Sequence, residues 1–245
     1  SASSPGSSIH LDGSTLNVAY VNATSGTLQH LVQHAEDVIG TLVDGDSHSV
    51  GSYGISMTVD GSGNQHIAYY NSSTSSLMYA SNEVGSWKTE EVDNTGSTGT
   101  YPSIAIDTND RPHISYISDN AVMLAHHNGT GWEIATVDDQ PTYAYDTSVA
   151  LDSGGSAHIS YQVYNGTGSS YNLRYASYNG SAWVAEDVKT SGRSSWSSYT
   201  WTGLSNQIKL NSTDTPHITY FEDYFNDVYI AIKNDGVWST TSVDS

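Results

Sequence analysis

Short alternating runs of apolar and polar residues recur along the chain and define one repeating unit. The clearest run is Ser-Ile-Ala-Ile-Asp at residues 103–107, and related runs occur at 148–152, 56–60, 8–12 and, most loosely, 207–211. After a polar turn, a second run reads His-Ile-x-Tyr at residues 66–69, 113–116, 158–161 and 217–220, with Asn-Val-Ala-Tyr at 17–20. Alternation with a period of two is typical of β-strands whose two faces differ.

Two further runs complete the unit. The third reads Leu-x-Tyr-Ala at residues 77–80 and 173–176, with weaker copies at 28–31, 122–125 and 228–231. The fourth opens with Trp87, Trp132, Trp183 or Trp238, whereas Val38 stands at that point in the first copy. Four short strands that recur about every 47 residues are the signature of a propeller blade. The sequence therefore predicts an all-β fold, a five-bladed β-propeller with four antiparallel strands per blade.

The predicted domain covers residues 8–245, after a flexible N-terminal lead at residues 1–7. Its blades are expected at residues 8–50, 51–97, 98–142, 143–198 and 199–245. Because neighbouring side chains of a strand point to opposite faces, each blade presents one large apolar face and one small, partly polar face. We expect the large face of one blade to pack on the small face of the next, and the first blade to close the ring against the fifth.

The repeat also resembles a known family. The pattern S-I-A-I-D-x-x-x-x-P-H-I-S-Y, then L-x-Y-A, then N-G-x-x-W-x-x-x-x-V is similar to bacterial and archaeal propeller repeats of the Asp-box class, the BNR or sialidase-like type. The resemblance covers roughly residues 8–244, and the turns at 81–87 and 177–183 resemble degenerate Asp boxes. It implies the propeller fold but no particular activity, because such propellers occur in enzymes, lectins and scaffolds.

Charge and composition narrow the range of partners. The formal net charge is −19, from 26 acidic and 7 basic residues, so nucleic acid and anionic membranes are unfavourable partners. The absence of cysteine excludes disulfides, zinc–thiolate sites and cysteine nucleophiles. No run is long and apolar enough for membrane insertion. Six Asn-x-Ser/Thr sequons favour export, and we expect an extracellular or cell-surface protein.

Repeated histidines and tryptophans have both a structural and a functional interpretation. His66, His113, His158 and His217 could suggest a metal ring, but each occupies the same position of its own blade and the four would not converge. We expect each histidine to hydrogen-bond near the turn that begins at Asp60, Asp107, Asp152 or Asn211. The tryptophans that open the fourth strands are predicted to be pegs in the core.

The predicted binding site lies in loops at one end of the propeller, where function usually resides. These loops connect the fourth strand to the next blade and the second strand to the third, and they are rich in aromatic residues. Aromatic rings beside Asp, Asn and Glu acceptors suit carbohydrates, because rings stack on sugar C–H faces. The predicted ligand-binding residues are Tyr53, Tyr101, Tyr145, Tyr164, Tyr171, Trp196, Tyr199, Trp201, Glu222, Asp223 and Tyr224. The alternative is that these tyrosines pack loop against loop.

The carboxylates of one loop leave two other chemistries open. Glu222, Asp223 and Asp227 could bind calcium through oxygen ligands, although their spacing matches no EF-hand, and no other cofactor is expected. They could also form the acid–base pair of a glycoside hydrolase. A sialidase would need an arginine cluster, and Arg111 is expected at the end opposite the predicted loops.

These patterns favour an exported, non-catalytic recognition module, with a carbohydrate, a glycoconjugate or a surface protein as its partner. One alternative is a carbohydrate-active enzyme, a glycoside hydrolase or polysaccharide lyase that uses Glu222, Asp223 or Asp227. The other is a structural or assembly propeller of a cell-envelope protein or filament.

Overall fold

The computed structural model describes residues 7–22, 24–34, 37–44, 50–164, 170–190, 202–222 and 227–243. These residues form twenty β-strands in five four-stranded sheets, and no helix occurs among them. Within each sheet the strands follow one another in chain order, and neighbouring strands whose pairing is resolved run antiparallel. No described segment is a helix able to span a membrane.

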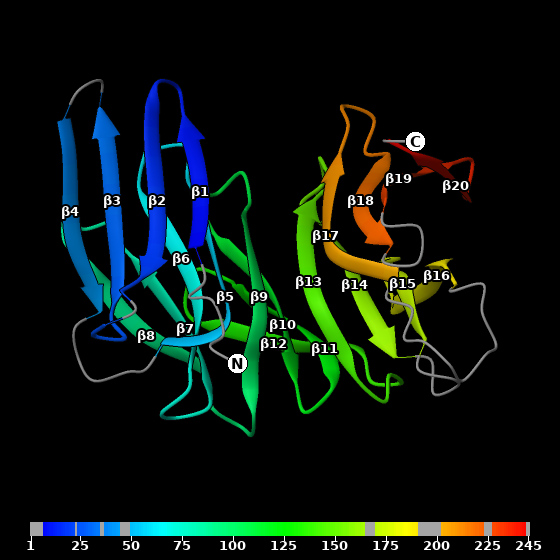
Figure 1. Ribbon diagram of the computed structural model, residues 1–245, viewed down its shortest axis with the longest axis horizontal. Helices are drawn as coiled ribbons and strands as arrows, with labels where there is room; N and C mark the ends of the chain where they lie inside the picture. Colours follow the sequence, from blue (N-terminus) through cyan, green and yellow to red (C-terminus); the bar gives the residue numbers. More distant parts are fainter. Residues whose placement is uncertain are drawn as a thin grey trace. The chain divides into compact units, whose positions relative to one another are not determined.

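The first three sheets come from the N-terminal part of the chain (Figure 1). Sheet 1 contains β1 (Ser7–Asp12), β2 (Thr15–Val21), β3 (Leu28–His34) and β4 (Asp37–Asp44). Sheet 2 contains β5 (Val50–Val59), β6 (Gln65–Asn71), β7 (Ser76–Ser81) and β8 (Lys88–Asp93). Sheet 3 contains β9 (Thr98–Ile106), β10 (Pro112–Ser118), β11 (Ala121–His127) and β12 (Trp132–Asp138).

The last two sheets repeat the same plan. Sheet 4 contains β13 (Ala144–Leu151), β14 (Ala157–Tyr164), β15 (Tyr171–Tyr178) and β16 (Trp183–Lys189). Sheet 5 contains β17 (Thr202–Leu210), β18 (Pro216–Glu222), β19 (Asp227–Asn234) and β20 (Val237–Ser242). The predicted four-strand repeat is therefore observed five times.

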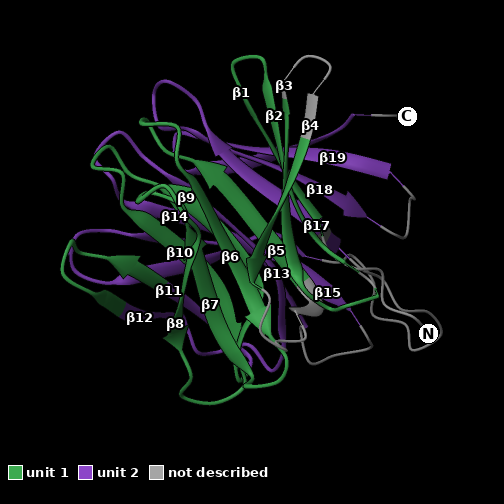
Figure 2. Cartoon of the chain, turned by 90° about the vertical axis from the view of Figure 1, so that its left-hand side faces the viewer, with its two compact units in different colours: residues 1–119, 125–133 green, residues 120–124, 134–245 purple. Residues whose placement is uncertain are grey.

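The chain divides into two compact units, coloured separately in Figure 2. Unit 1 comprises residues 1–119 and 125–133, and unit 2 comprises residues 120–124 and 134–245. Two contacts between consecutive sheets can be compared. We call the contact of sheets 2 and 3 within unit 1 joint 2–3, and that of sheets 4 and 5 within unit 2 joint 4–5. Joint 1–2, also in unit 1, connects sheets 1 and 2.

Each joint buries the large apolar face predicted from the alternation. In unit 1, Ile67, Tyr69 and Leu77 are fully buried, and Ile208, Ile218 and Tyr220 have the same role in unit 2. A serine on the small face adds a hydrogen bond to the first strand of the next sheet. The amides of Met57, Ile104 and Ile208 donate to the hydroxyls of Ser8, Ser56 and Ser148, at 3.0, 3.1 and 3.2 Å.

The first strands of sheets 2 to 5 begin earlier than predicted. Tyr53 and Tyr101 were predicted in loops between blades, but β5 begins at Val50 and β9 at Thr98, so both residues belong to strands. A register shift interrupts each of these strands beside a residue in the left-handed region, namely Gly54, Tyr101, Asp146 or Ser205, with φ of 104°, 52°, 49° and 50°. Such a bulge lets the strand bend and continue, which explains why the turn-like sequences remain in the sheet.

Candidate functional site

A cleft of about 650 Å³ opens at joint 2–3 in unit 1. Its walls come from the β5–β6 turn, the β7–β8 hairpin and the β9–β10 turn. Tyr79 of β7 and Glu90 of β8 line it together and are direct cross-strand partners. The cleft combines an aromatic ring with carboxylate, amide and guanidinium groups, which can bind a polar ligand.

One wall of the cleft is fixed by the turn that follows β5. Asp60 Oδ1 accepts hydrogen bonds from the amides of Ser62 and Asn64 at 2.9 and 2.8 Å, and its Oδ2 accepts from Asn64 Nδ2 at 2.8 Å. Burial would raise the pKa of Asp60, but these hydrogen bonds and one from His66 lower it below its ordinary value. Asp60 is therefore a charged structural anchor of the wall.

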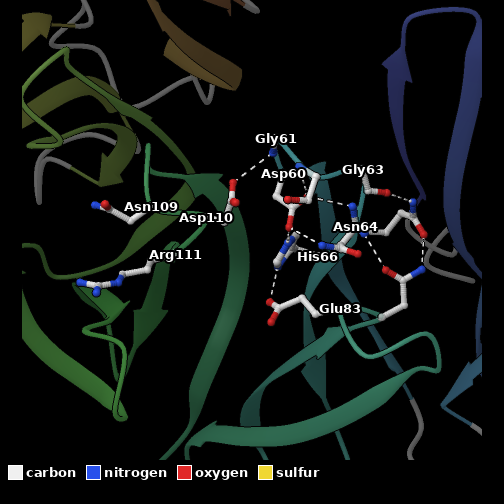
Figure 3. A network of polar contacts seen from close by, with 12 residues as sticks. Asp60, Gly61, Gly63, Asn64, His66, Glu83, Asn109, Asp110 and Arg111 are labelled. Carbon is white, nitrogen blue, oxygen red and sulfur yellow. Dashed lines mark hydrogen bonds and ion pairs between the residues drawn. The ribbon is translucent and has the colours of Figure 1, made fainter.

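His66 connects this turn to Tyr79 of the cleft, and Figure 3 shows its contacts with Asp60 and Glu83. A carboxylate only accepts, so His66 Nε2 donates to Asp60 Oδ2 at 3.2 Å and the Tyr79 hydroxyl donates to His66 Nδ1 at 2.5 Å. Glu83 Oε1 lies 3.6 Å from His66 Nδ1 on the cleft side. Burial raises the pKa of Tyr79, so its phenol stays protonated at neutral pH.

The same network occurs again in unit 2. His158 Nε2 lies 3.4 Å from Asp152 Oδ2, and its Nδ1 lies 2.5 Å from the Tyr175 hydroxyl. In sheet 3 the corresponding separation, His113 Nε2 to Asp107 Oδ2, is 3.9 Å. His217 instead bonds the Thr215 carbonyl at 3.0 Å. The prediction that the repeated histidines hydrogen-bond near these turns is confirmed for His66, His158 and His217, but not for His113. The recurrence in sheets 2 and 4 identifies the Asp–His–Tyr arrangement as structural.

The opposite wall is the β9–β10 turn, where Asn109 and Arg111 are exposed. Between them, Asp110 adopts φ of 60°, and its Oδ1 accepts a hydrogen bond from the Gly61 amide at 3.1 Å, which ties the two turns together (Figure 3). The Arg111 guanidinium passes over Gly129, where an added Cβ would lie 3.0 Å from Nη2. Among the described residues, no carboxylate forms an ion pair with Arg111, so its guanidinium is available to a ligand.

The tryptophans that open the fourth strands are half-buried, and three of them, Trp87, Trp132 and Trp238, contact the preceding sheet. Trp132 packs edge-on against Tyr79 with ring centroids 5.2 Å apart, and its Nε1 donates to Glu90 Oε1 at 2.7 Å. At joint 1–2, Trp87 has the same relation to His30, at 5.2 Å, and to Thr41 Oγ1, at 3.4 Å. The prediction of core pegs is confirmed for Trp87 and Trp238, which pack against the hydrophobic core clusters of their units while staying half-buried.

Joint 1–2 carries a second cleft, of about 550 Å³. It is lined by His30, Thr41, Gln65, Asn82 and Trp87, and it contains no acidic residue, lysine or arginine. Burial lowers the pKa of His30 to about 4, so this lining is neutral at physiological pH. Joints 1–2 and 2–3 thus have clefts at equivalent positions of the repeat. The cleft at joint 2–3 is lined by charged residues, and the cleft at joint 1–2 is lined by neutral ones.

The structure gathers three of the predicted site residues in unit 2. The ring of Tyr171 lies 5.9 Å from that of Tyr145 and 5.5 Å from that of Tyr164. Tyr143 completes this tyrosine cluster at 6.3 Å from Tyr164. Tyr171 is only 8% exposed, so its ring serves mainly as packing for the others.

Glu222 takes no part in the ring contacts of the tyrosine cluster. It is the last residue of β18 and is 5% exposed. Burial raises its pKa, against a lowering effect of Lys189, and the negative charge of Asp227 adds to the rise. Among the described residues, Glu222 Oε2 has no hydrogen-bond partner, and the same holds for Thr202 Oγ1, which belongs to its cross-strand neighbour.

The other predicted site residues are separate from these groups or cannot be located. Tyr101 lies in unit 1, half-buried in the bulge of β9. Tyr53 belongs to β5, but its side chain is outside the described part of the structure. Five predicted residues lie outside the described residues altogether, namely Trp196, Tyr199, Trp201, Asp223 and Tyr224.

Comparison with known proteins identifies the fold. No family model matches the chain, and no curated protein matches it in sequence. Among solved structures, a polysaccharide lyase of family PL25, an ulvan lyase bound to -[GlcA(1-4)Rha3S]-, aligns over 96% of this chain and 69% of its own with a TM-score of 0.67 and 13% identity. The lectin SapL1 in complex with alpha methyl fucoside aligns over 98% of this chain and 80% of its own, with a TM-score of 0.60 and 16% identity.

A thermostable family-43 glycoside hydrolase also aligns, over 98% of this chain and 94% of its own, with a TM-score of 0.54 and 12% identity. At these identities the likeness establishes the fold alone. The chain has an all-β, propeller-like fold of repeated four-stranded antiparallel sheets, shared with lectin, hydrolase and lyase structures. The resemblance to Asp-box repeats in particular stays a prediction.

Proposed function

We propose that this chain is a non-catalytic carbohydrate-recognition module, and that the cleft at joint 2–3 is a binding site. The observation that carries the proposal is the lining of that cleft. Tyr79 lines it with the small part of its ring that is exposed, 7% of the residue, while Asn64, Asn109 and Arg111 offer donors and Glu83 offers an acceptor near it. Sugars are recognised by this combination of an aromatic platform with a few polar groups that orient hydroxyls.

Three further points support the proposal. The neutral cleft at joint 1–2 repeats the position, so two sites on one chain could raise the avidity for a polymeric glycan. The fold is shared with a lectin and with a lyase that was solved with an oligosaccharide. We further propose that the five sheets close into a five-bladed ring, that the chain acts outside the cell, and that the predicted aromatic loops form a second sugar-binding surface around Tyr145, Tyr164 and Tyr171.

A glycan-array screen followed by calorimetry tests this proposal. Arg111→Ala and Asn109→Ala remove exposed groups of the cleft, so each should weaken binding of the array ligand at least about tenfold without changing the melting temperature. Lys209→Ala, an exposed change elsewhere, is the matched control and should leave the affinity unchanged. Unchanged affinity in the cleft variants would mean that the ligand binds at the aromatic loops instead. Absence of binding to every glycan on the array would favour the structural or assembly alternative.

One observation favours a second function, that of a carbohydrate-active enzyme. Glu222 has a raised pKa, an unpartnered carboxylate oxygen and a second carboxylate, Asp227, directly opposite it on β19. A raised pKa is what a general acid requires, and two carboxyl groups are what glycoside hydrolysis requires. Release of reducing ends from a bound polysaccharide, abolished by Glu222→Gln but not by the exposed change Asp235→Asn, would establish it. Binding without products would exclude it for the glycans tested.

A further inference from the structure

Joint 4–5 holds an ammonium group in a cage of three side chains. Lys233 Nζ lies 2.6 Å from Glu186 Oε1 and 5.0 and 5.8 Å from the ring centroids of Tyr175 and Trp238. Trp238 packs edge-on against Tyr175 at 5.2 Å, and its Nε1 donates to the same Glu186 oxygen at 2.8 Å. The lysine thus receives one charge-assisted contact and two cation–π contacts from groups that hold one another in place.

Joint 2–3 contains the same cage. Tyr79 and Glu90 are cross-strand partners, as are Tyr175 and Glu186, and in each case the third member is the tryptophan near the start of the fourth strand of the next sheet. The Tyr79 and Trp132 rings are 5.2 Å apart at 71°, against 5.2 Å at 69° for Tyr175 and Trp238. The Trp132 Nε1 to Glu90 Oε1 distance is 2.7 Å. The two cages therefore agree in all three of their internal contacts.

The two cages differ in what fills them. His127 takes the sequence position of Lys233, two residues after the alanine that recurs in the third strand, and its ring forms an edge contact with that of Trp132 at 5.5 Å. Among the described residues, no lysine or arginine forms an ion pair with Glu90, although Lys88 and Arg111 line the same cleft. Four carboxylates line it as well, those of Asp60, Glu83, Glu90 and Asp110. The lining is therefore acidic, and the cage opens onto it through Tyr79 and Glu90.

We infer that the cleft at joint 2–3 binds a ligand with a protonated amine, which takes the place that Lys233 occupies at joint 4–5. This inference rests on the proposed carbohydrate function and specifies its substrate class as saccharides with free amino groups. The ammonium contacts Glu90 and the Tyr79 ring, while the rest of the sugar occupies the cleft toward Asn109 and Arg111. Joint 1–2 lacks this specificity, because His30 and Thr41 replace the tyrosine and the glutamate.

Two trisaccharides that differ only at their amino groups, free in one and acetylated in the other, test the inference. Calorimetry at pH 6 would compare the β-1,4-linked glucosamine trimer, with free amines, with its fully N-acetylated form. The free-amine trimer should bind at least about tenfold more tightly, and Glu90→Gln, which keeps an acceptor for Trp132, should remove that preference. Glu186→Gln is the matched control at joint 4–5, and it should leave both affinities unchanged.

Two reciprocal substitutions add a lysine ammonium to the cage at joint 2–3 or remove the one at joint 4–5. His127→Lys places an internal ammonium at joint 2–3 and should weaken the free-amine trimer at least about tenfold. Lys233→Ala empties the cage at joint 4–5 and should raise the number of amine-dependent sites from one to two. Retained binding in the first variant together with an unchanged stoichiometry in the second would overturn the inference.

The outcomes also separate this inference from the proposed function. Equal affinity for both trimers, insensitive to Glu90→Gln, would overturn the amine specificity while leaving carbohydrate binding in place. Binding of n-butylamine that is lost in Glu90→Gln, without binding of either trimer, would support the cage and overturn the carbohydrate proposal. Absence of binding for all three probes would overturn both.

Discussion

Joint 2–3 and joint 4–5 are built from the same repeat, yet they place their charges differently. At joint 2–3 the Tyr116 hydroxyl donates to Asp93 Oδ2 at 2.7 Å, and Thr98 Oγ1 donates to the Asp93 carbonyl at 2.7 Å. At joint 4–5 Lys189 stands at the position of Asp93, so Tyr220 and Thr202 lose this partner. The carboxylate appears instead at the end of the second strand of the next sheet, as Glu222 at the position of Ser118.

The two joints therefore differ in which end has its polar groups paired within the protein and which end leaves them available. Joint 2–3 is saturated with hydrogen bonds around Asp93 and open at the cage of Tyr79 and Glu90. Joint 4–5 is filled at the cage by Lys233, and around Glu222 it has buried oxygens with no hydrogen-bond partner in the described part of the chain. Buried polar groups are normally hydrogen-bonded, so we expect a ligand or a bound proton where such a group has no partner.

The largest expected effect concerns a glycine present at both joints. Gly99 has φ of 94°, and an added Cβ would lie 2.5 Å from Leu77 Cα, whereas at Gly203, with φ of 91°, the nearest atom, Leu173 Cβ, is 3.1 Å away. Gly99→Ala should lower the free energy of unfolding by about 3 kcal/mol or more, and Gly203→Ala by about 2 kcal/mol. Urea denaturation measures both.

Gly180→Ala is the control for the dihedral alone, because φ is 92° there and no atom lies within 4 Å of the added Cβ. It should cost about 1 kcal/mol. Equal losses in all three variants would show that the close approach to Leu77 contributes nothing and that the two joints do not differ in this respect.

Removing one hydroxyl from each joint tests the aspartate partner directly. Tyr116→Phe leaves Oδ2 of the buried Asp93 carboxylate without its donor and should cost about 2 kcal/mol in the free energy of unfolding. Tyr220→Phe removes a hydroxyl that has no such carboxylate, and its cost should stay below about 0.5 kcal/mol. Similar costs would mean that Lys189 or a solvent molecule replaces the aspartate at joint 4–5.

Exchanging the charges should convert joint 4–5 into a copy of joint 2–3. Lys189→Asp alone brings a second carboxylate toward Glu222, while Glu222→Ser alone removes the charge that Lys189 faces. The double variant restores the pair found as Asp93 and Ser118. A double-mutant cycle should therefore give a favourable coupling of about 1 kcal/mol. Strict additivity would show that the two positions do not interact.

The smallest effect is a dependence of stability on pH. Because the pKa of Glu222 is higher in the folded protein than in the unfolded chain, its contribution to stability is fully present below the unfolded pKa and is lost as pH rises through the folded pKa. Glu222→Gln, which cannot ionise, should raise the melting temperature by about 2 °C at pH 7 and by less at pH 4. A larger gain at pH 4 would contradict the raised pKa.

The repeat could be predicted because period-two alternation and the recurring His-Ile-x-Tyr run are local signals. The cage could not, because it depends on the cross-strand register of Tyr79 with Glu90 and on a tryptophan from the following repeat. Arg111 lies on the β9–β10 turn, at the end expected for it. The sequence placed the binding site in the loops at the opposite end, so Arg111 was not among the predicted binding residues. Glu222 was singled out as a loop acid, whereas its burial in β18 follows from packing that a sequence does not display.

The serine ties between first strands have a consequence for how such a chain can be inherited. In each tie the earlier repeat supplies a hydroxyl, from Ser8, Ser56 or Ser148, and the later repeat supplies only a backbone amide. Every amino acid except proline has that amide. A gene segment encoding one repeat can therefore be duplicated or exchanged by recombination. The serine of the preceding repeat can still accept a hydrogen bond from the backbone amide of the inserted repeat, whichever side chain other than proline stands there.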